Sequence, residues 1–202
     1  MKTLVLVEHD NTKVNDATLA VVTAAGKLGE VHLLVAGHNC GSVAEAAAKI
    51  AGVGKVHVAD DAAYANGLAE NVAPLAAELM GHHDAFLAAA TTQGKNVAPR
   101  VAAHLDVMQV SEILSVEGPK TFTRPIYAGN AIATVESSDA KLVITVRGTA
   151  FAKAAATGGS ASVEAVAATA EDNQRNAPRC ANNGHAIVRL KQTGRKSSHG
   201  VL

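Results

Sequence analysis

Aromatic residues and cysteine are scarce in this sequence of 202 residues. It has no Trp, two Tyr and three Phe, so a core must be built mainly from Ala, Val, Leu and Ile. Small side chains let helices lie close to a sheet, which suits a layered α/β domain. The two cysteines, Cys40 and Cys180, are far apart and form no CxxC pair. We therefore expect free thiols in a reducing compartment rather than a disulfide or a metal site.

Long apolar runs and a signal-peptide profile are also missing. No stretch reaches the roughly 18 apolar residues that a membrane-spanning helix requires. The N-terminus instead leads directly into a short apolar run that is typical of a buried strand. We therefore predict a cytoplasmic protein. Its length allows one α/β domain with a substantial core, but not two domains of that kind.

Basic residues are depleted in most of the chain, although the formal net charge of the whole is +0. Six of the 18 basic residues lie in residues 173–202, where there is no Asp or Glu. Residues 1–172 hold the other 12 basic residues and all 18 acidic ones, a net charge of −6. This argues against a nucleic-acid-binding function, which needs basic residues clustered on the folded body. We predict one domain over 1–170 and a basic, poorly ordered tail over 171–202.

Apolar runs alternate with amphipathic segments in the first half of the chain. This alternation indicates right-handed βαβ units, a parallel sheet and helices on both of its faces. Ser42 is predicted to cap the second helix, with Glu45 completing a capping box. The strands are predicted at 3–7, 31–36, 55–59 and 85–90, and the helices at 15–26, 43–51, 68–80 and 94–104.

Beyond Leu105 the apolar runs follow one another too closely for helices to fit between them. The short turns favour hairpins, so we predict an antiparallel extension of the parallel sheet. The predicted fold class is thus a three-layer α/β/α parallel sheet with an antiparallel hairpin extension. A partner surface is expected at its exposed edge. These strands are predicted at 113–116, 121–126, 131–135 and 142–146, with a short last strand at 162–167.

A possible anion or nucleotide site lies at the start of the fourth predicted helix. Thr91, Thr92 and Lys95 follow a buried strand there, and the spacing is not that of a Walker A loop. Helix N-terminal amides, hydroxyls and an ammonium group could together bind a phosphate. The alternative interpretation is ordinary helix capping by Thr.

Three short segments near strand ends contain histidine and other residues that can bind metals. They are His9-Asp10, His38-Asn39-Cys40 and His82-His83-Asp84, and none has CxxC or HxxxH spacing. We interpret the first as a turn that caps the next helix and the other two as solvated loop residues. No metal site is predicted. No catalytic residue is predicted either, because GxSxG, HExxH and GxGxxG motifs are absent from the sequence.

Arginine and aromatic residues are combined in residues 124–151. Arg and Tyr are enriched among the energetically dominant contacts of protein interfaces, and the guanidinium group suits carboxylate and phosphate partners. Surface salt bridges within the domain are the alternative interpretation. We predict a partner interface that includes Arg124, Tyr127, Asn130, Arg147 and Phe151.

Six segments resemble, in order, the N-terminal domain of the electron transfer flavoprotein α subunit. Each is weak evidence alone, but the ordered set across residues 4 to 161 is specific. The segments are LVLVEH (4–9), HLLVAG (32–37), GKNVAPRVAA (94–103), RPIYAGNA (124–131), TVRGTAF (145–151) and GGSA (158–161).

The resemblance implies an adenine-nucleotide α-hydrolase-like fold and a heterodimer with the electron transfer flavoprotein β subunit. Such heterodimers carry electrons from acyl-CoA-type dehydrogenases, as in fatty acid β-oxidation, to a membrane quinone oxidoreductase. FAD is implied mainly in a C-terminal α domain, and a structural AMP, where present, in β. The chain is then a scaffold and dimerisation domain of an electron carrier, without catalytic residues of its own. The alternative function is an adenine-nucleotide-binding module of the same fold.

Residues 171–202 do not resemble the flavin domain that follows in this family. The positions that would match its FAD-binding residues are absent, so none is assigned to this sequence. We expect either a frame disruption or cloning artefact, or a separately encoded flavin domain. Reading the nucleotide sequence downstream would distinguish these two explanations.

Overall fold

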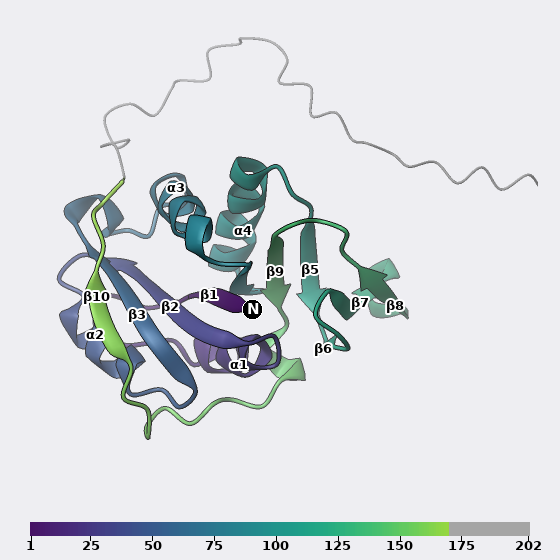
Figure 1. Ribbon diagram of the computed structural model, residues 1–202, viewed down its shortest axis with the longest axis horizontal. Helices are drawn as coiled ribbons and strands as arrows, with labels where there is room; N and C mark the ends of the chain where they lie inside the picture. The colour runs from purple at the N-terminus through teal and green to yellow at the C-terminus, as the bar shows by residue number, and fades with distance from the viewer. Residues whose placement is uncertain (170–202) are drawn as a thin grey trace, which may run out of the picture.

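Continuous apolar runs form a central sheet of seven strands in the order β10-β3-β2-β1-β4-β9-β5, and every pairing in it is parallel (Figure 1). The computed structural model describes residues 1–169. Both faces of the sheet are covered, which explains why inner strands such as β4 are apolar at every position. The strands are β1 (Lys2–Leu6), β2 (Glu30–Gly37), β3 (Val53–Asp60), β4 (Ala85–Ala89), β5 (Gln109–Ile113), β9 (Leu142–Val146) and β10 (Ser162–Ala165).

Two helices cover each face of the sheet. Helices α1 (Asp16–Gly26) and α2 (Gly41–Ala48) pack on one core cluster, and α3 (Ala69–Leu79) and α4 (Thr92–Leu105) pack on the other. The side chains of β1 alternate between these clusters, as the period of a strand requires: Val5 belongs to the first, and Leu4 and Leu6 to the second. The predicted three-layer α/β/α class is therefore confirmed.

The antiparallel strands form a sheet of their own rather than an extension of the main sheet. Strands β6 (Ser115–Val116), β7 (Thr121–Ile126) and β8 (Ala131–Glu136) make this three-stranded sheet, which lies beside β5 at one end of the domain (Figure 1). The prediction that 142–146 belongs to the hairpins was wrong, because β9 runs parallel between β4 and β5. Its five residues are all buried, which is the pattern of an inner parallel strand.

Most other elements lie within a few residues of their predicted positions. Asn15 caps α1 by accepting a hydrogen bond from the Ala17 amide at 3.0 Å. The strand predicted at 162–167 is β10, which pairs with β3 at the edge opposite the three-stranded sheet. Strand β5 was missed, since only 113–116 was predicted there. The predicted tail, 171–202, lies outside the described residues. Within residues 1–169, no helix combines the length and apolarity needed to cross a membrane.

The capping box predicted for α2 is wrong. Ser42 lies inside this helix, and its hydroxyl donates to the Thr12 carbonyl at 3.4 Å. The turn before the helix is held instead by Asp60 at the end of β3, whose carboxylate accepts from the amides of Asn39 (2.7 Å) and Cys40 (3.1 Å). A carboxylate near a helix N-terminus is also favoured by the helix dipole. The partner is 20 residues away in sequence, so local spacing could not reveal it.

Replacing the carboxylate that holds this turn should destabilise the domain more than removing the hydroxyl that sequence spacing favoured. We expect Asp60→Ala to lower the free energy of unfolding by about 1 kcal/mol, as for the loss of a helix cap. Ser42→Ala is the matched control, with an expected change below about 0.5 kcal/mol. Urea denaturation of both variants measures the difference. A larger loss for Ser42→Ala would contradict the assignment.

Candidate functional site

The chain changes direction in the sheet between β1 and β4, and the segments that follow these two strands meet at one edge. Open α/β sheets bind ligands at such a switch point, outside the carboxyl ends of the strands. Residues 8–11 follow β1 and residues 90–97 follow β4, and members of both segments line one open cavity of about 570 Å³. This edge of the sheet is therefore the candidate ligand site.

Thr91, at the end of β4, is the N-cap of α4, and its hydroxyl oxygen accepts from the Gly94 amide at 3.2 Å. The same hydroxyl donates to the carboxylate of Glu8. A Cβ on Gly94 would lie 1.9 Å from the Ala89 carbonyl oxygen, so only glycine lets the helix start this close to the strand. The capping interpretation of Thr91 is confirmed.

The other two residues of the predicted anion site differ in their surroundings. Lys95 forms an ion pair with Glu112. Thr92 is exposed at the first position of α4 and lines the switch-point cavity. Anion binding by these residues stays a prediction, and a phosphate there would have to compete with the partners that Thr91 and Lys95 already have.

Glu8 brings a carboxylate to the N-terminus of α4, where a phosphate would otherwise bind. The residue is buried, and burial raises the pKa of its carboxyl group, while the Thr91 hydroxyl and the Gly94 amide act in the opposite direction. Because this position is taken by an acidic side chain of the chain itself, it does not fit the pyrophosphate of FAD. We therefore assign no part in flavin binding to the described residues.

Polar groups of the β1 loop tie neighbouring loops together. The Asp10 carboxylate accepts from the Thr12 amide and hydroxyl and from the Lys13 amide, and these bonds lower its pKa to about 2. His9 accepts from the Asn11 amide at 3.1 Å, and burial lowers the pKa of its imidazole. His9 and Asp10 thus lie in a turn as predicted, but they do not cap the next helix, because the N-cap of α1 is Asn15. Asn11 in turn bonds the backbone of His38 and Ala65.

The five residues predicted for a partner interface divide into exposed and buried groups. Tyr127 is 79% exposed and Asn130 is also exposed, both at the turn between β7 and β8. Phe151 is only 8% exposed and packs in the core on the α1 face, with the Lys27 ammonium 5.4 Å from its ring centre. Its ring is therefore core in this chain and does not supply exposed aromatic area. Tyr127 is the aromatic residue that remains for an interface.

Arg124 on β7 and Arg147 directly after β9 both lie near Glu112. Lys95, which bonds this carboxylate, is the main cause of its lowered pKa, and the two arginines add to the effect. Arg147 is exposed, whereas the Nε of Arg124 is buried without a hydrogen-bond partner. Neither arginine forms a salt bridge among the described residues, so the alternative interpretation is not confirmed, and the partner interface stays a prediction in which Arg147 has an exposed side chain.

Sequence reasoning missed a group of three buried histidines, His32, His57 and His83, contributed by β2, β3 and the loop before β4. The interpretation of His83 as a solvated loop residue was wrong, because its side chain is turned into the protein and is 3% exposed. Cys40 is buried and free, and burial raises the pKa of its thiol. A single His within each of two apolar strands was the only sequence signal for the group.

The buried Glu8 predicts a pH effect on stability. Its folded-state pKa is raised above 4.5, so the folded state holds this proton more tightly than the unfolded state does. Folding stability contributed by this group is therefore lost as the pH rises from 4.5 through the raised value. We expect Glu8→Gln, which does not titrate, to gain stability relative to wild type over this interval. The measurement is urea denaturation at several pH values.

The control for this experiment is Glu45→Gln, at an exposed position of α2. Its stability curve against pH should run parallel to that of wild type. Parallel curves for Glu8→Gln and wild type would show that the Glu8 carboxyl titrates alike in both states, contrary to the expectation.

Comparison with known proteins agrees with this architecture. The sequence model of the electron transfer flavoprotein domain family matches residues 3–171. The chain is 60% identical over 172 residues to the electron transfer flavoprotein subunit alpha of Pseudomonas aeruginosa, covering 85% of this chain and 56% of that protein. It is 58% identical over 172 residues to the subunit alpha of Bradyrhizobium diazoefficiens (85% and 54%), and 46% identical over 169 residues to the mitochondrial subunit alpha of Dictyostelium discoideum (79% and 48%).

The chain spans about half the length of the curated relatives that it matches. The match covers nearly all of the described domain, and the parallel sheet with its small antiparallel sheet is the architecture that carries the six matching segments. The chain therefore belongs to the electron transfer flavoprotein family and matches its α subunit.

Proposed function

We propose that this chain supplies the scaffold and subunit interface of an electron transfer flavoprotein, pairing with a β subunit. The observation that carries the proposal is the three-stranded sheet beside β5, which presents Tyr127 and the 66% exposed Ile132 to solvent. Large exposed apolar side chains on a protruding element are typical of protein contact surfaces. The 60% identity to a protein named as an α subunit supports a β subunit as the partner.

In this proposal the redox chemistry belongs to FAD bound outside the described residues. A flavin supplies the electron transfer when bound, and protein groups serve to bind and orient it. The described part of the chain contributes support instead, because Glu8 occupies the start of α4 at the switch point. We extend the proposal to electron donors of the acyl-CoA dehydrogenase type, a membrane quinone oxidoreductase as acceptor, and a cytoplasmic location.

The switch-point cavity supports a second candidate, an adenine-nucleotide-binding module. It is open and its lining is largely polar, with side chains that suit a nucleotide base or ribose. The Glu8 carboxylate beside the α4 N-terminus opposes a phosphate in the same place, which makes this function second. The polar lining residues include His9, Asp10, Asn11, Asn66, Glu70, Thr92, Gln93 and Asn96.

The two functions differ in what the purified chain binds alone. As a scaffold, the chain should show no flavin absorbance and no heat of binding with AMP or ATP in calorimetry. A yellow protein with stoichiometric flavin would contradict the scaffold function. A micromolar dissociation constant for AMP would instead favour the nucleotide-binding module.

The interface is tested with the β subunit encoded in the same genome. Wild-type chain should form a complex in size-exclusion chromatography, and Tyr127→Ala should weaken it by about thirtyfold, the effect of losing one dominant contact residue. Val163→Ala is the matched control, since Val163 is 52% exposed on β10 at the opposite edge of the main sheet. Equal loss in both variants, or no complex with wild type, would refute the proposed interface.

A further inference from the structure

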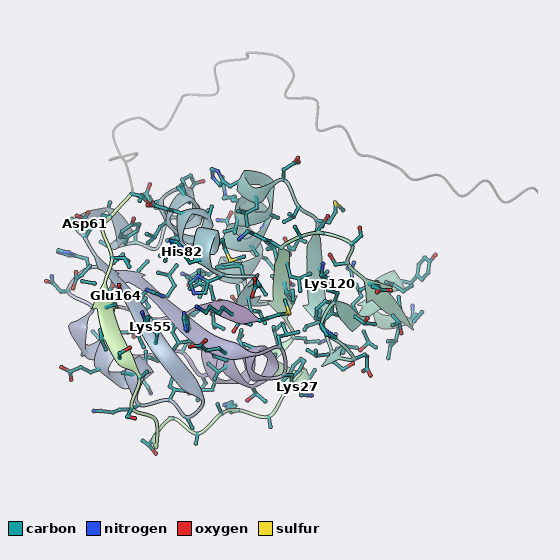
Figure 2. The ribbon with its side chains drawn as sticks, viewed as in Figure 1. Lys27, Lys55, Asp61, His82, Lys120 and Glu164 are labelled. Atoms are coloured by element: carbon teal, nitrogen blue, oxygen red, sulfur yellow. The ribbon has the colours of Figure 1, made fainter. Side chains whose placement is uncertain are left out.

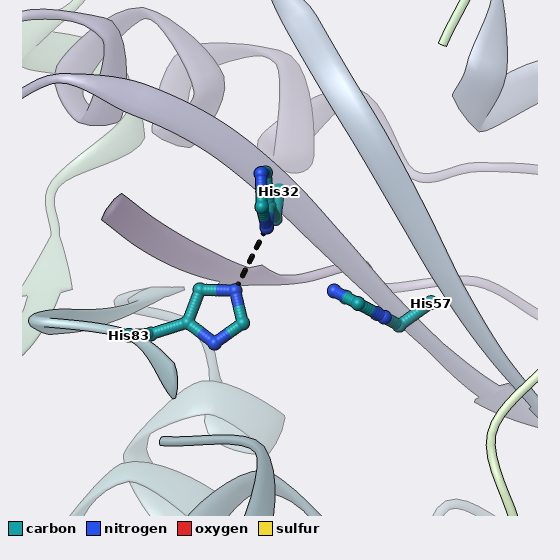
Figure 3. Close-up of side chains that lie close together, drawn as sticks. All are labelled: His32, His57 and His83. Atoms are coloured by element: carbon teal, nitrogen blue, oxygen red, sulfur yellow. Dashed lines mark hydrogen bonds between the residues drawn. The ribbon is translucent and has the colours of Figure 1, made fainter. Parts of the chain in front are cut away.

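Three imidazole rings converge between β2, β3 and the loop that precedes β4 (Figure 3). One nitrogen of each of His32, His57 and His83 lies within 4.8 Å of the others, and the ring centres are 5.0 to 5.6 Å apart. All three residues are buried, with exposed fractions of 7%, 8% and 3%. We name this group, His32, His57 and His83, the histidine cluster.

The positions of these residues are set by the backbone. In the parallel pairing of β2 with β3, His32 lies opposite Lys55 and His57 is two residues farther along, so both side chains point to the same face of the sheet. His83 is held by its carbonyl, which accepts from Lys141 at 2.9 Å. These elements are all part of the rigid core of the domain, so the cluster is preorganised.

Hydrogen bonds on the outside of the cluster determine where two ring protons lie. His83 Nδ1 is 2.7 Å from the Leu79 carbonyl oxygen, and a carbonyl can only accept, so this nitrogen carries a proton. His32 Nε2 is 3.0 Å from the Glu30 carboxylate, which likewise accepts. A carbonyl or carboxylate that accepts the outward ring proton is the usual outer partner of a metal-bound histidine.

The inner nitrogens of these two rings therefore face each other without a proton of their own. His32 Nδ1 and His83 Nε2 are 2.9 Å apart, joined by the dashed line in Figure 3. Two lone pairs at this distance repel each other unless a proton or a metal cation lies between them. The pair thus requires either one added proton, shared between the two nitrogens, or a metal cation.

His57 adds a third nitrogen ligand that is not engaged in a hydrogen bond among the described residues. Both of its ring nitrogens are buried without a hydrogen-bond partner, a costly arrangement for a polar side chain. One of them points toward the other two rings (Figure 3). A neutral imidazole ring has one nitrogen with a lone pair, and one nitrogen of His57 lies within 4.8 Å of those of the other two rings. A shared proton between His32 and His83 would leave both nitrogens of His57 without a partner, whereas a cation would bind one nitrogen of each of the three rings.

We propose that the histidine cluster binds a divalent transition-metal ion of the zinc class. Imidazole nitrogens suit Zn²⁺ and its neighbours, whereas Mg²⁺ and Ca²⁺ require oxygen ligands. Nitrogens at about 2.0–2.1 Å from one tetrahedral zinc lie roughly 3.4 Å apart, and the observed separations, from 2.9 to at most 4.8 Å, bracket this value. Small rotations of the rings close the site.

Two carboxylates at the rim of the cluster complete its surroundings. Glu30 accepts from His32, and Glu164 on β10 lies 3.8 Å from His57 Nδ1 and pairs with Lys55 at 2.9 Å, a contact that Figure 2 places between β10 and β3. Negative charge here lowers the cost of burying a cation. A bound ion would link β2, β3 and the loop before β4, so its role is to stabilise the support that the proposed complex needs.

The test uses the full chain after removal of metals with a chelator. Calorimetric titration with Zn²⁺ should show one ion bound per chain and a rise in melting temperature. His57→Gln should weaken this binding by more than about 100-fold, beyond the roughly 10–100-fold cost of losing an outer partner. This residue is the best choice because its ring makes no hydrogen bond that the substitution would break.

His82→Gln is the matched control, because His82 is exposed and adjacent to His83 in sequence. This variant should bind Zn²⁺ as wild type does. Tetrahedral coordination is checked with Co²⁺, whose intense visible absorption should appear in wild type and His82→Gln but not in His57→Gln.

Two results would overturn the proposal. One is the absence of stoichiometric Zn²⁺ binding by wild type. The other is unchanged binding by a folded His57→Gln, which would place the ion at histidines elsewhere in the chain. If His57→Gln does not fold, imidazole ¹⁵N spectra of wild type decide the matter. Shifts of His32, His57 and His83 on adding Zn²⁺ support the site, and shifts confined to other histidines refute it.

Discussion

Both faces of the central sheet are covered by helices, and this constraint governs the rest of the domain. A polar side chain on a buried strand, or at its end, has no water to bond and must find a partner within the protein. Glu8 after β1 is buried and meets this requirement with the Thr91 hydroxyl at the start of α4. The same constraint makes the histidine cluster conspicuous, because His57 has no hydrogen-bond partner among the described residues.

The two edges of the sheet therefore differ in chemistry. At the carboxyl edge, carboxylates of the chain itself occupy the positions near helix N-termini where phosphates bind in many α/β proteins. On the other side of the sheet, the imidazole rings of the histidine cluster converge, with ring nitrogens directed inwards. At the first edge these carboxylates are paired within the chain, whereas the second holds imidazole nitrogens without a hydrogen-bond partner within residues 1–169. This contrast is why we place the nucleotide-binding function second, and why we propose a metal ion for the unsatisfied imidazole nitrogens.

The three-stranded sheet is buried on one side and exposed on the other. Its core-facing side packs through Phe122, which is fully buried, so the sheet is anchored to the domain. Its other side carries alternating exposed positions on β8 and ends at the exposed Tyr127. An anchored element that exposes Tyr127 and Ile132 is suited to a contact with a second subunit, since little conformational entropy is lost when an anchored surface binds.

The sequence alone determined the family, the three-layer class and most element positions, because these depend on local patterns. The apolar runs of β1 and β4, the Asn15 cap and the six matching segments are all read within a few residues of the chain. It could not assign β9, since one apolar run fits both a hairpin and an inner parallel strand until its neighbours are known.

Only the tertiary structure decided which polar side chains meet. Asp60 replaced Ser42 as the partner of the α2 turn, Phe151 turned into the core, and three histidines separated by 25 and 26 positions in sequence came within 4.8 Å. The physical reason is the same in each case. Hydrogen bonding, burial and ligand geometry depend on strand order and register, which the folded sheet as a whole sets, whereas local sequence encodes only the period and the ends of each element.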